Sequence, residues 1–147
     1  MPELKRHDNR LGIWGWLGGG RWGMERYAYI LHRVTGLGIL AYFLMHICVT
    51  SLRAWGIYLW TGEGAFLDAP VFKVGEFLVF SAFAFHAFNG VRLILVELGF
   101  AVGKPIEPVY PYKSSLHVQR PLFLAMMVLA AVFFAAGSYE FWHGLAR

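Results

Sequence analysis

Three long apolar runs, separated by short polar connections, dominate the sequence. They extend over about residues 28–52, 74–100 and 122–142, and a helix needs roughly 20 residues, at about 1.5 Å each, to cross the hydrocarbon core of a bilayer. Only 15% of the residues are charged, against about a quarter in a typical soluble domain. We therefore predict an all-α membrane protein in which residues 28–147 form one domain of three transmembrane helices. Pro121 is expected to begin the third helix, where its missing N–H costs nothing.

The first 27 residues contain no apolar stretch long enough for a cleavable signal peptide. They contain instead three tryptophans, Trp14, Trp16 and Trp22, among several glycines. Indole rings favour the headgroup region of a bilayer, because they combine an apolar ring with one polar N–H. We interpret residues 1–27 as a cytoplasmic and interfacial segment that precedes the first span.

The positive charges predict how the spans are oriented. Most lysines and arginines lie before the first span, at its start, or between the second and third spans: Lys5, Arg6, Arg10, Arg21, Arg26, Arg33, Lys104, Lys113 and Arg120. The opposite side carries fewer, namely Arg53, Lys73 and Arg147. Cytoplasmic loops are enriched in lysine and arginine, so we expect a cytoplasmic N-terminus and a location in the cytoplasmic (inner) membrane. The same charges are read as topology signals rather than as a nucleic-acid-binding patch.

Histidines inside the spans are the most informative residues, because an ionisable group at membrane depth costs a few kcal/mol. His86 lies near the middle of the second span, with the small residues Ala87 and Gly90 close to it. Neutral imidazole ligates haem iron, and a flat macrocycle needs small residues beside its ligand. The alternative is a histidine that only forms a hydrogen bond to a neighbouring helix, and position alone leaves both readings open.

His46, in the first span, is a second candidate ligand. It follows His32 by 14 residues (46 − 32), which at about 100° and 1.5 Å per residue places both nearly on one helix face, roughly 21 Å apart. Counting from the expected span ends, we predict that His46 lies about 7 Å nearer the outer surface than His86. A core histidine that bridges two helices is again the alternative.

The cytoplasmic end of the first span carries His32 and Arg33 beside Tyr29 and Thr35. A guanidinium group there can bind a carboxylate, such as a haem propionate, or donate a hydrogen bond to a quinone carbonyl. The alternative is an arginine that extends to the membrane surface beside an interfacial histidine.

Two short motifs resemble the cytochrome b subunit of succinate dehydrogenase. Residues 29–36, Tyr-Ile-Leu-His-Arg-Val-Thr-Gly, resemble the H-R-x-[ST]-G start of the first helix in that family. Residues 86–92, His-Ala-Phe-Asn-Gly-Val-Arg, resemble the H-x-x-x-G-[IV]-R segment of its second helix. The resemblance covers about residues 23–99, with a compatible third span.

The resemblance implies a haem- and quinone-binding membrane anchor of respiratory complex II. A member of this family bundles with a second membrane-anchor subunit, and the pair anchors an iron–sulfur subunit and a flavoprotein subunit that oxidises succinate. The membrane chain then has no catalytic residue for succinate itself. His86 matches an axial ligand of haem b, Arg33 a residue near the quinone and the haem propionates, and His32 a propionate neighbour.

Two positions depart from the family pattern. Tyr29 stands where some members have a serine that helps to bind quinone, so Tyr29 is the residue expected beside Arg33 at a quinone. His46 has no counterpart in members with one haem, whereas members with two haems carry a first-helix histidine at about this separation from the second-helix ligand (86 − 46 = 40 residues). The resemblance therefore implies one haem b, with His86 as an axial ligand. If His46 is also an axial ligand, the resemblance implies two haems.

Three functions remain open on the sequence. In the first, electrons from succinate reduce a membrane quinone near Arg33 and equilibrate with haem, and fumarate reduction is the reverse path. The second is a cytochrome b anchor of another quinone-linked dehydrogenase, such as a formate dehydrogenase or hydrogenase, although such anchors usually have more spans. The third is a haem-free helical scaffold or small transporter. The single cysteine, Cys48, cannot hold an iron–sulfur cluster in this chain, because a cluster needs about four ligands.

Overall fold

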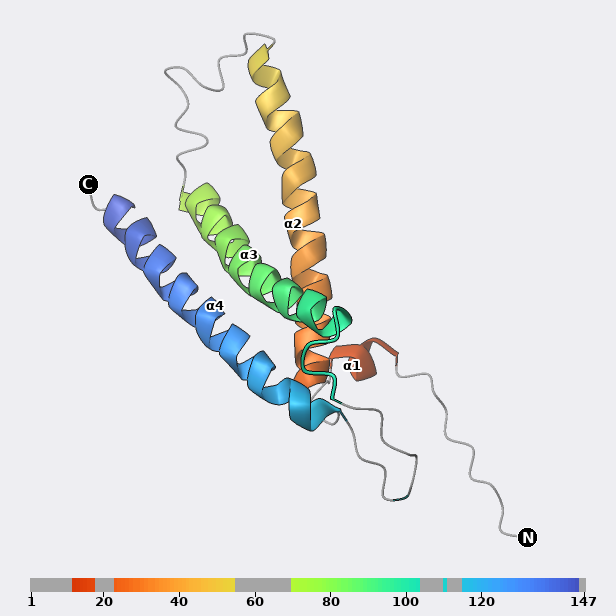
Figure 1. Cartoon of the computed structure of the whole chain (residues 1–147). Helices are drawn as coiled ribbons and strands as arrows, with labels where there is room; N and C mark the ends of the chain where they lie inside the picture. The colour runs from red at the N-terminus through yellow and green to blue at the C-terminus, as the bar shows by residue number, and fades with distance from the viewer. Residues whose placement is uncertain (1–11, 18–22, 55–69, 104–109, 111–114, 146–147) are drawn as a thin grey trace.

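The computed structural model describes four helices and, within the same residues, no strand (Figure 1). The described residues are 12–17, 23–54, 70–103, 110 and 115–145. The helices are α1 (Gly12–Leu17), α2 (Met24–Ala54), α3 (Pro70–Glu97) and α4 (Leu116–Leu145). Helices α2, α3 and α4 are each long and apolar enough to cross a membrane. The predicted all-α membrane protein with three spans is confirmed. Within the N-terminal segment, Trp14 is exposed on α1, whereas Trp22 and the side chain of Trp16 lie outside the described residues.

Helix α3 ends three residues before the predicted residue 100, because glycine allows the chain to turn there. The Gly99 N–H donates to the Val96 carbonyl at 3.0 Å, and the Phe100 N–H donates to the Leu95 carbonyl at 2.9 Å. Gly99 has a φ of 91°, in the left-handed region that residues with a Cβ disfavour. These two bonds and this φ form a Schellman motif, which satisfies the last carbonyl groups of a helix.

Helix α4 begins at Leu116, so the prediction that Pro121 begins it is wrong. The Ser115 carbonyl accepts the N–H of Gln119 at 3.2 Å, and the Gln119 amide group donates to the Ser115 hydroxyl at 3.4 Å. These bonds start the helix in the polar residues before the apolar run. Pro121 then lies in the second turn, where its ring nitrogen cannot donate to the His117 carbonyl. His117 is exposed, so water or headgroups can satisfy that carbonyl.

Helix α3 lies between α2 and α4 (Figure 1). The start of α2, the end of α3 and the start of α4 lie at one end of the bundle, which we call the basic end because it carries Arg26, Arg33, Arg92 and Arg120. An ion pair between Arg120 Nε and Glu25 Oε1, at 2.8 Å, joins α4 to α2 at this end. Beyond its first half, α2 diverges from α3 (Figure 1).

Aromatic rings form much of the interface between α3 and α4. Their centroids lie 5.4 to 6.2 Å apart, and the rings belong to Phe77, Phe80 and Phe88 of α3 and to Phe133, Phe134, Phe141 and Trp142 of α4. A Cβ atom at Gly137 would overlap the Phe80 ring. Close packing of small residues and rings is what holds helices together in lipid, since the hydrophobic effect does not act there.

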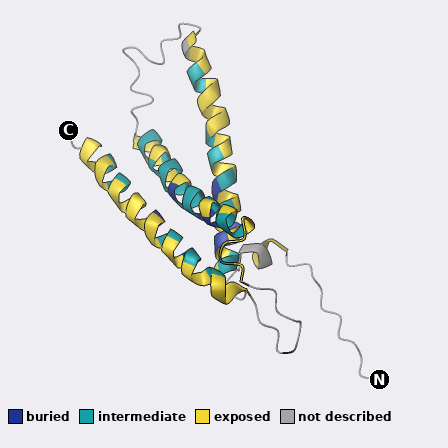
Figure 2. Ribbon diagram, in the orientation of Figure 1, coloured by how far each residue is buried: buried dark blue, intermediate teal, exposed yellow. Residues whose placement is uncertain are grey.

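Most of the molecular surface is apolar. Figure 2 shows exposed residues along the second half of α2 and over much of α4, and they include Leu40, Phe43, Leu44, Val128 and Val132. Soluble monomers rarely expose a continuous apolar surface of this extent. The surface is therefore suited to lipid and to other membrane helices, as expected for a multi-pass membrane protein.

Candidate functional site

The His86 imidazole lies against the first half of α2. Its Nδ1 atom is 3.1 Å from the main-chain oxygen of His32 and 3.3 Å from Thr35 Oγ1. A Cβ atom added at Gly36 would lie only 2.8 Å from His86 Cε1, so glycine is required for this close approach of ring and helix. The structure thus joins the H-R-x-[ST]-G motif of α2 to the histidine of the α3 motif.

The His32 ring stacks on the His86 ring, with 3.9 Å between the centroids and 5° between the planes. A Cβ atom at Gly90 would make ordinary contact with His32, 3.6 Å from Cε1. His32 Nδ1 is buried and has no hydrogen-bond partner among the residues that the structure describes. An unpaired buried polar atom costs about 1–3 kcal/mol, so this nitrogen marks a place where a polar group of a ligand would be stabilised.

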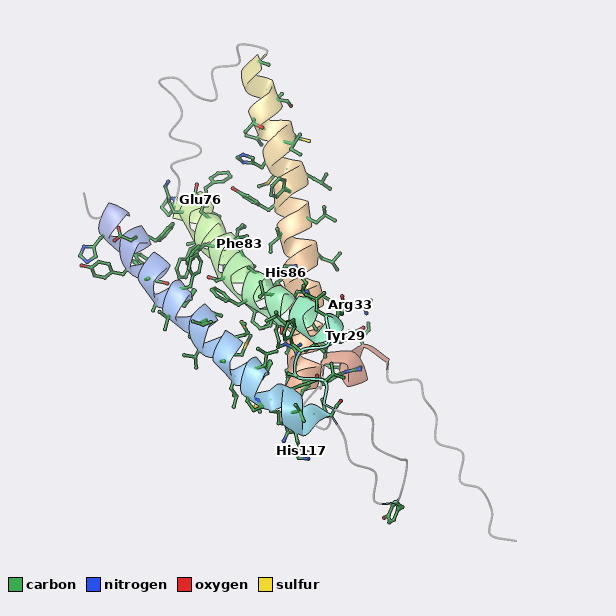
Figure 3. All side chains as sticks on the ribbon, viewed as in Figure 1. Tyr29, Arg33, Glu76, Phe83, His86 and His117 are labelled. Atoms are coloured by element: carbon green, nitrogen blue, oxygen red, sulfur yellow. The ribbon has the colours of Figure 1, made fainter. Side chains whose placement is uncertain are left out.

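Arg33 and Tyr29 lie together at the basic end, on the outer surface of α2 (Figure 3). The Arg33 guanidinium carbon is 5.1 Å from the centroid of the Tyr29 ring, and that of Arg26 is 5.8 Å from the same ring. A guanidinium over a ring face is held by cation–π attraction and keeps its N–H donors free at the edge. The structure therefore brings the two predicted quinone residues together, on a surface open to a ligand or a partner.

His46 lies far from this cluster, on the part of α2 that diverges from α3. It is exposed, and its ring lies beside Tyr42 with 5.7 Å between centroids. Because His86 contacts the turn from His32 to Gly36, His46 is at least ten residues, or roughly 15 Å, further along α2 than His86.

The predicted offset of about 7 Å between His46 and His86 is therefore too small. Helix α2 already begins at Met24, five residues before Tyr29, so the count from Tyr29 did not give the level at which α2 meets His86. The larger offset means that the two imidazoles cannot ligate the same iron.

A buried polar pair, which the sequence argument left without a role, links α3 to α4. Asn89 is 0% exposed and Arg92 8% exposed, and Arg92 Nε donates to Asn89 Oδ1 at 3.0 Å. The Arg92 guanidinium carbon lies 5.4 Å from the centroid of Phe123 on α4. The sequence did contain a signal for this pair. Asn89 and Arg92 are three residues apart, a spacing that places both on one helix face.

The residues around His86 fit a haem better than a bare metal ion. Among the described residues, no group of three or more histidine, cysteine or acidic side chains could hold a metal ion, whereas haem iron needs only axial ligands from the protein. His86 Nε2 forms no hydrogen bond to any described residue. Gly36 and Gly90 put no side chain between the two rings and the facing helix backbones, and His32 Nδ1, when protonated, could donate a hydrogen bond to a propionate.

Comparison with known proteins agrees with the motifs. The chain matches the family "Succinate dehydrogenase/Fumarate reductase transmembrane subunit" over residues 12–136. A succinate dehydrogenase hydrophobic membrane anchor subunit of Halobacterium salinarum is 28% identical over 134 residues, which are 90% of this chain and 88% of that protein. A membrane subunit of succinate dehydrogenase 2 from Mycobacterium tuberculosis is 26% identical over 106 residues, 72% of this chain and 74% of that protein. No solved structure matches the chain significantly.

Proposed function

The chain belongs to the succinate dehydrogenase/fumarate reductase transmembrane subunit family, and from this premise we propose that it binds haem b through His86 and passes electrons from succinate oxidation to a membrane quinone. As a membrane anchor subunit it is part of an oxidoreductase. Succinate oxidation itself would occur in a flavoprotein subunit, and an iron–sulfur subunit would deliver the electrons to the membrane. We propose a second membrane-anchor subunit as the source of the other axial ligand.

The observation that carries the proposal is the fixed His86 imidazole, with Nδ1 facing α2 and Nε2 unpaired. When bound, haem b supplies a one-electron carrier at membrane depth. His86 would hold the iron, the turn from His32 to Gly36 holds the His86 ring, and a protonated Nδ1 of His32 would donate a hydrogen bond to a propionate.

The quinone would bind at the surface formed by Arg33 and Tyr29. A quinone takes up two electrons and two protons to become a quinol, and negative charge develops on its carbonyl oxygens during reduction. The Arg33 guanidinium can stabilise that charge through charge-assisted hydrogen bonds, and the Tyr29 ring, 5.1 Å away, helps to hold the guanidinium in place. Fumarate reduction would use the same groups in reverse.

His46 would ligate a second haem, nearer to the other end of the bundle than the haem at His86. Its exposed ring and its position roughly 15 Å further along α2 suit a separate cofactor bound with a partner helix. The positive charges at the basic end favour the cytoplasm for that end. We accordingly propose a cytoplasmic N-terminus in the inner membrane.

The proposed function is tested by His86→Leu in the purified complex, with His117→Leu as the control. His117 is an exposed histidine at the start of α4 (Figure 3). His86→Leu should abolish or shift a low-spin haem signal in the reduced-minus-oxidised visible spectrum, and His117→Leu should leave that signal unchanged. Full haem content and an unaltered spectrum in the His86→Leu complex would refute the assignment.

A further inference from the structure

The Nδ1 atom of His86 faces an oxygen that can only accept a hydrogen bond. The main-chain oxygen of His32, 3.1 Å away, has lone pairs and no proton. A deprotonated Nδ1 would turn its own lone pair toward this oxygen, and the two would repel each other. Nδ1 therefore carries the proton and donates it to α2.

The Thr35 hydroxyl is oriented as a second acceptor for the same proton. Its oxygen lies 2.8 Å from the Leu31 carbonyl and 3.1 Å from the His32 carbonyl. A hydroxyl has one proton and two lone pairs, so its proton goes to the preceding turn and a lone pair faces His86. Thr50 makes the same pair of contacts further along α2, to the carbonyl groups of His46 and Ile47, but forms no hydrogen bond to an imidazole of the described residues.

We propose that Thr35 and the main-chain carbonyl of His32 are positioning groups that select the Nδ1–H tautomer of His86 and so present its Nε2 lone pair to a haem iron. This inference rests on the proposed function of His86 as an axial ligand. A neutral imidazole has one N–H, so a proton on Nδ1 leaves Nε2 free to bind a metal. The stacked His32 ring and the contact at Gly36 fix the plane of the imidazole, while the two oxygens fix which nitrogen is protonated.

The same contacts predict an effect on the redox potential. A hydrogen bond from the outer N–H of a ligating histidine makes its other nitrogen more basic. A more basic ligand donates more charge to the iron, which stabilises the ferric state relative to the ferrous state. Removing the Thr35 acceptor should therefore move the midpoint potential of the haem to a more positive value.

The test compares Thr35→Val, Thr35→Ser and Thr50→Val in the intact, detergent-purified complex. Valine keeps the branched shape of threonine and removes the hydroxyl, whereas serine keeps the hydroxyl. The readout is the midpoint potential of the haem signal that His86→Leu removes, measured by a redox titration of the visible spectrum. We expect a positive shift in Thr35→Val, and wild-type potentials in Thr35→Ser and in Thr50→Val.

A Thr35→Val complex with full haem and an unshifted potential would overturn the proposal, as would equal shifts in Thr35→Val and Thr35→Ser. If Thr35→Val loses haem while it still oxidises succinate with a phenazine-type acceptor, and Thr35→Ser keeps haem, the positioning role is supported. A wild-type complex without haem, or a His86→Leu complex that retains its haem, would refute the proposed function itself and the role of Thr35 with it.

Discussion

Gly36→Ala tests the contact between α2 and the His86 ring, because it adds one methyl group between them. The new Cβ would lie 2.8 Å from His86 Cε1. Ordinary carbon–carbon contacts begin near 3.5 Å, so the ring must move by about 0.7 Å. It cannot tilt freely, since the His32 ring is stacked on it and Nδ1 is bonded to the His32 carbonyl.

The free-energy cost of this crowding follows from known overpacking effects. Inserting a methyl group into a packed site costs about 1–3 kcal/mol, and every 1.4 kcal/mol is a tenfold change in affinity. We therefore expect Gly36→Ala to lower haem affinity by about 5- to 150-fold. Helix propensity acts in the opposite direction, because alanine is favoured over glycine in a helix by about 0.5–1 kcal/mol.

Gly38→Ala is a matched control for the propensity effect. Gly38 lies two residues away on α2, and a Cβ atom there would meet nothing within 4 Å. The assay is the ratio of haem to protein in the purified complex, together with the thermal stability of the complex. Full haem content in Gly36→Ala, or equal haem loss in Gly36→Ala and Gly38→Ala, would show that the close approach of His86 to α2 does not support cofactor binding.

Three further predictions concern the other residues of the site. Arg33→Leu should depress quinone reduction while succinate oxidation by a phenazine-type acceptor continues; a parallel loss of both activities would indicate failed assembly instead. His46→Leu should lower the haem count from two to one per complex, and a single haem in the wild-type complex would remove the case for His46 as a ligand. Asn89→Leu should destabilise the complex by about 1–3 kcal/mol, because the buried Arg92 Nε loses its acceptor; its melting temperature is compared with that of Ser138→Ala, which loses only a bond within α4.

The three spans could be predicted from the sequence because the length of an apolar run is a direct consequence of bilayer thickness. The helix ends could not, since they depend on local hydrogen bonds rather than on hydropathy. The hydrogen bonds to Ser115 extend α4 by more than a turn, and the left-handed Gly99 shortens α3. Neither feature changes the length of the apolar run.

The composition of the site followed partly from the sequence. His32 and His86 could each be identified from the motif of a single helix. The stacking of their rings could not be predicted, because it depends on how α2 crosses α3. That crossing also decides the axial level of His46, which is why the predicted offset from His86 was too small. The Asn89–Arg92 pair was missed as a unit because arginine near a span end is usually explained by the membrane surface, whereas here it is buried against α4.

The most direct measurement of the central claim is an experimentally determined structure of the purified complex at a resolution that shows the side chain of His86. We predict that His86 Nε2 is bonded to the iron of a haem b, with Nδ1 still within hydrogen-bond distance of the His32 carbonyl. A structure in which His86 Nε2 faces protein or lipid, with no haem in contact with it, would contradict the account.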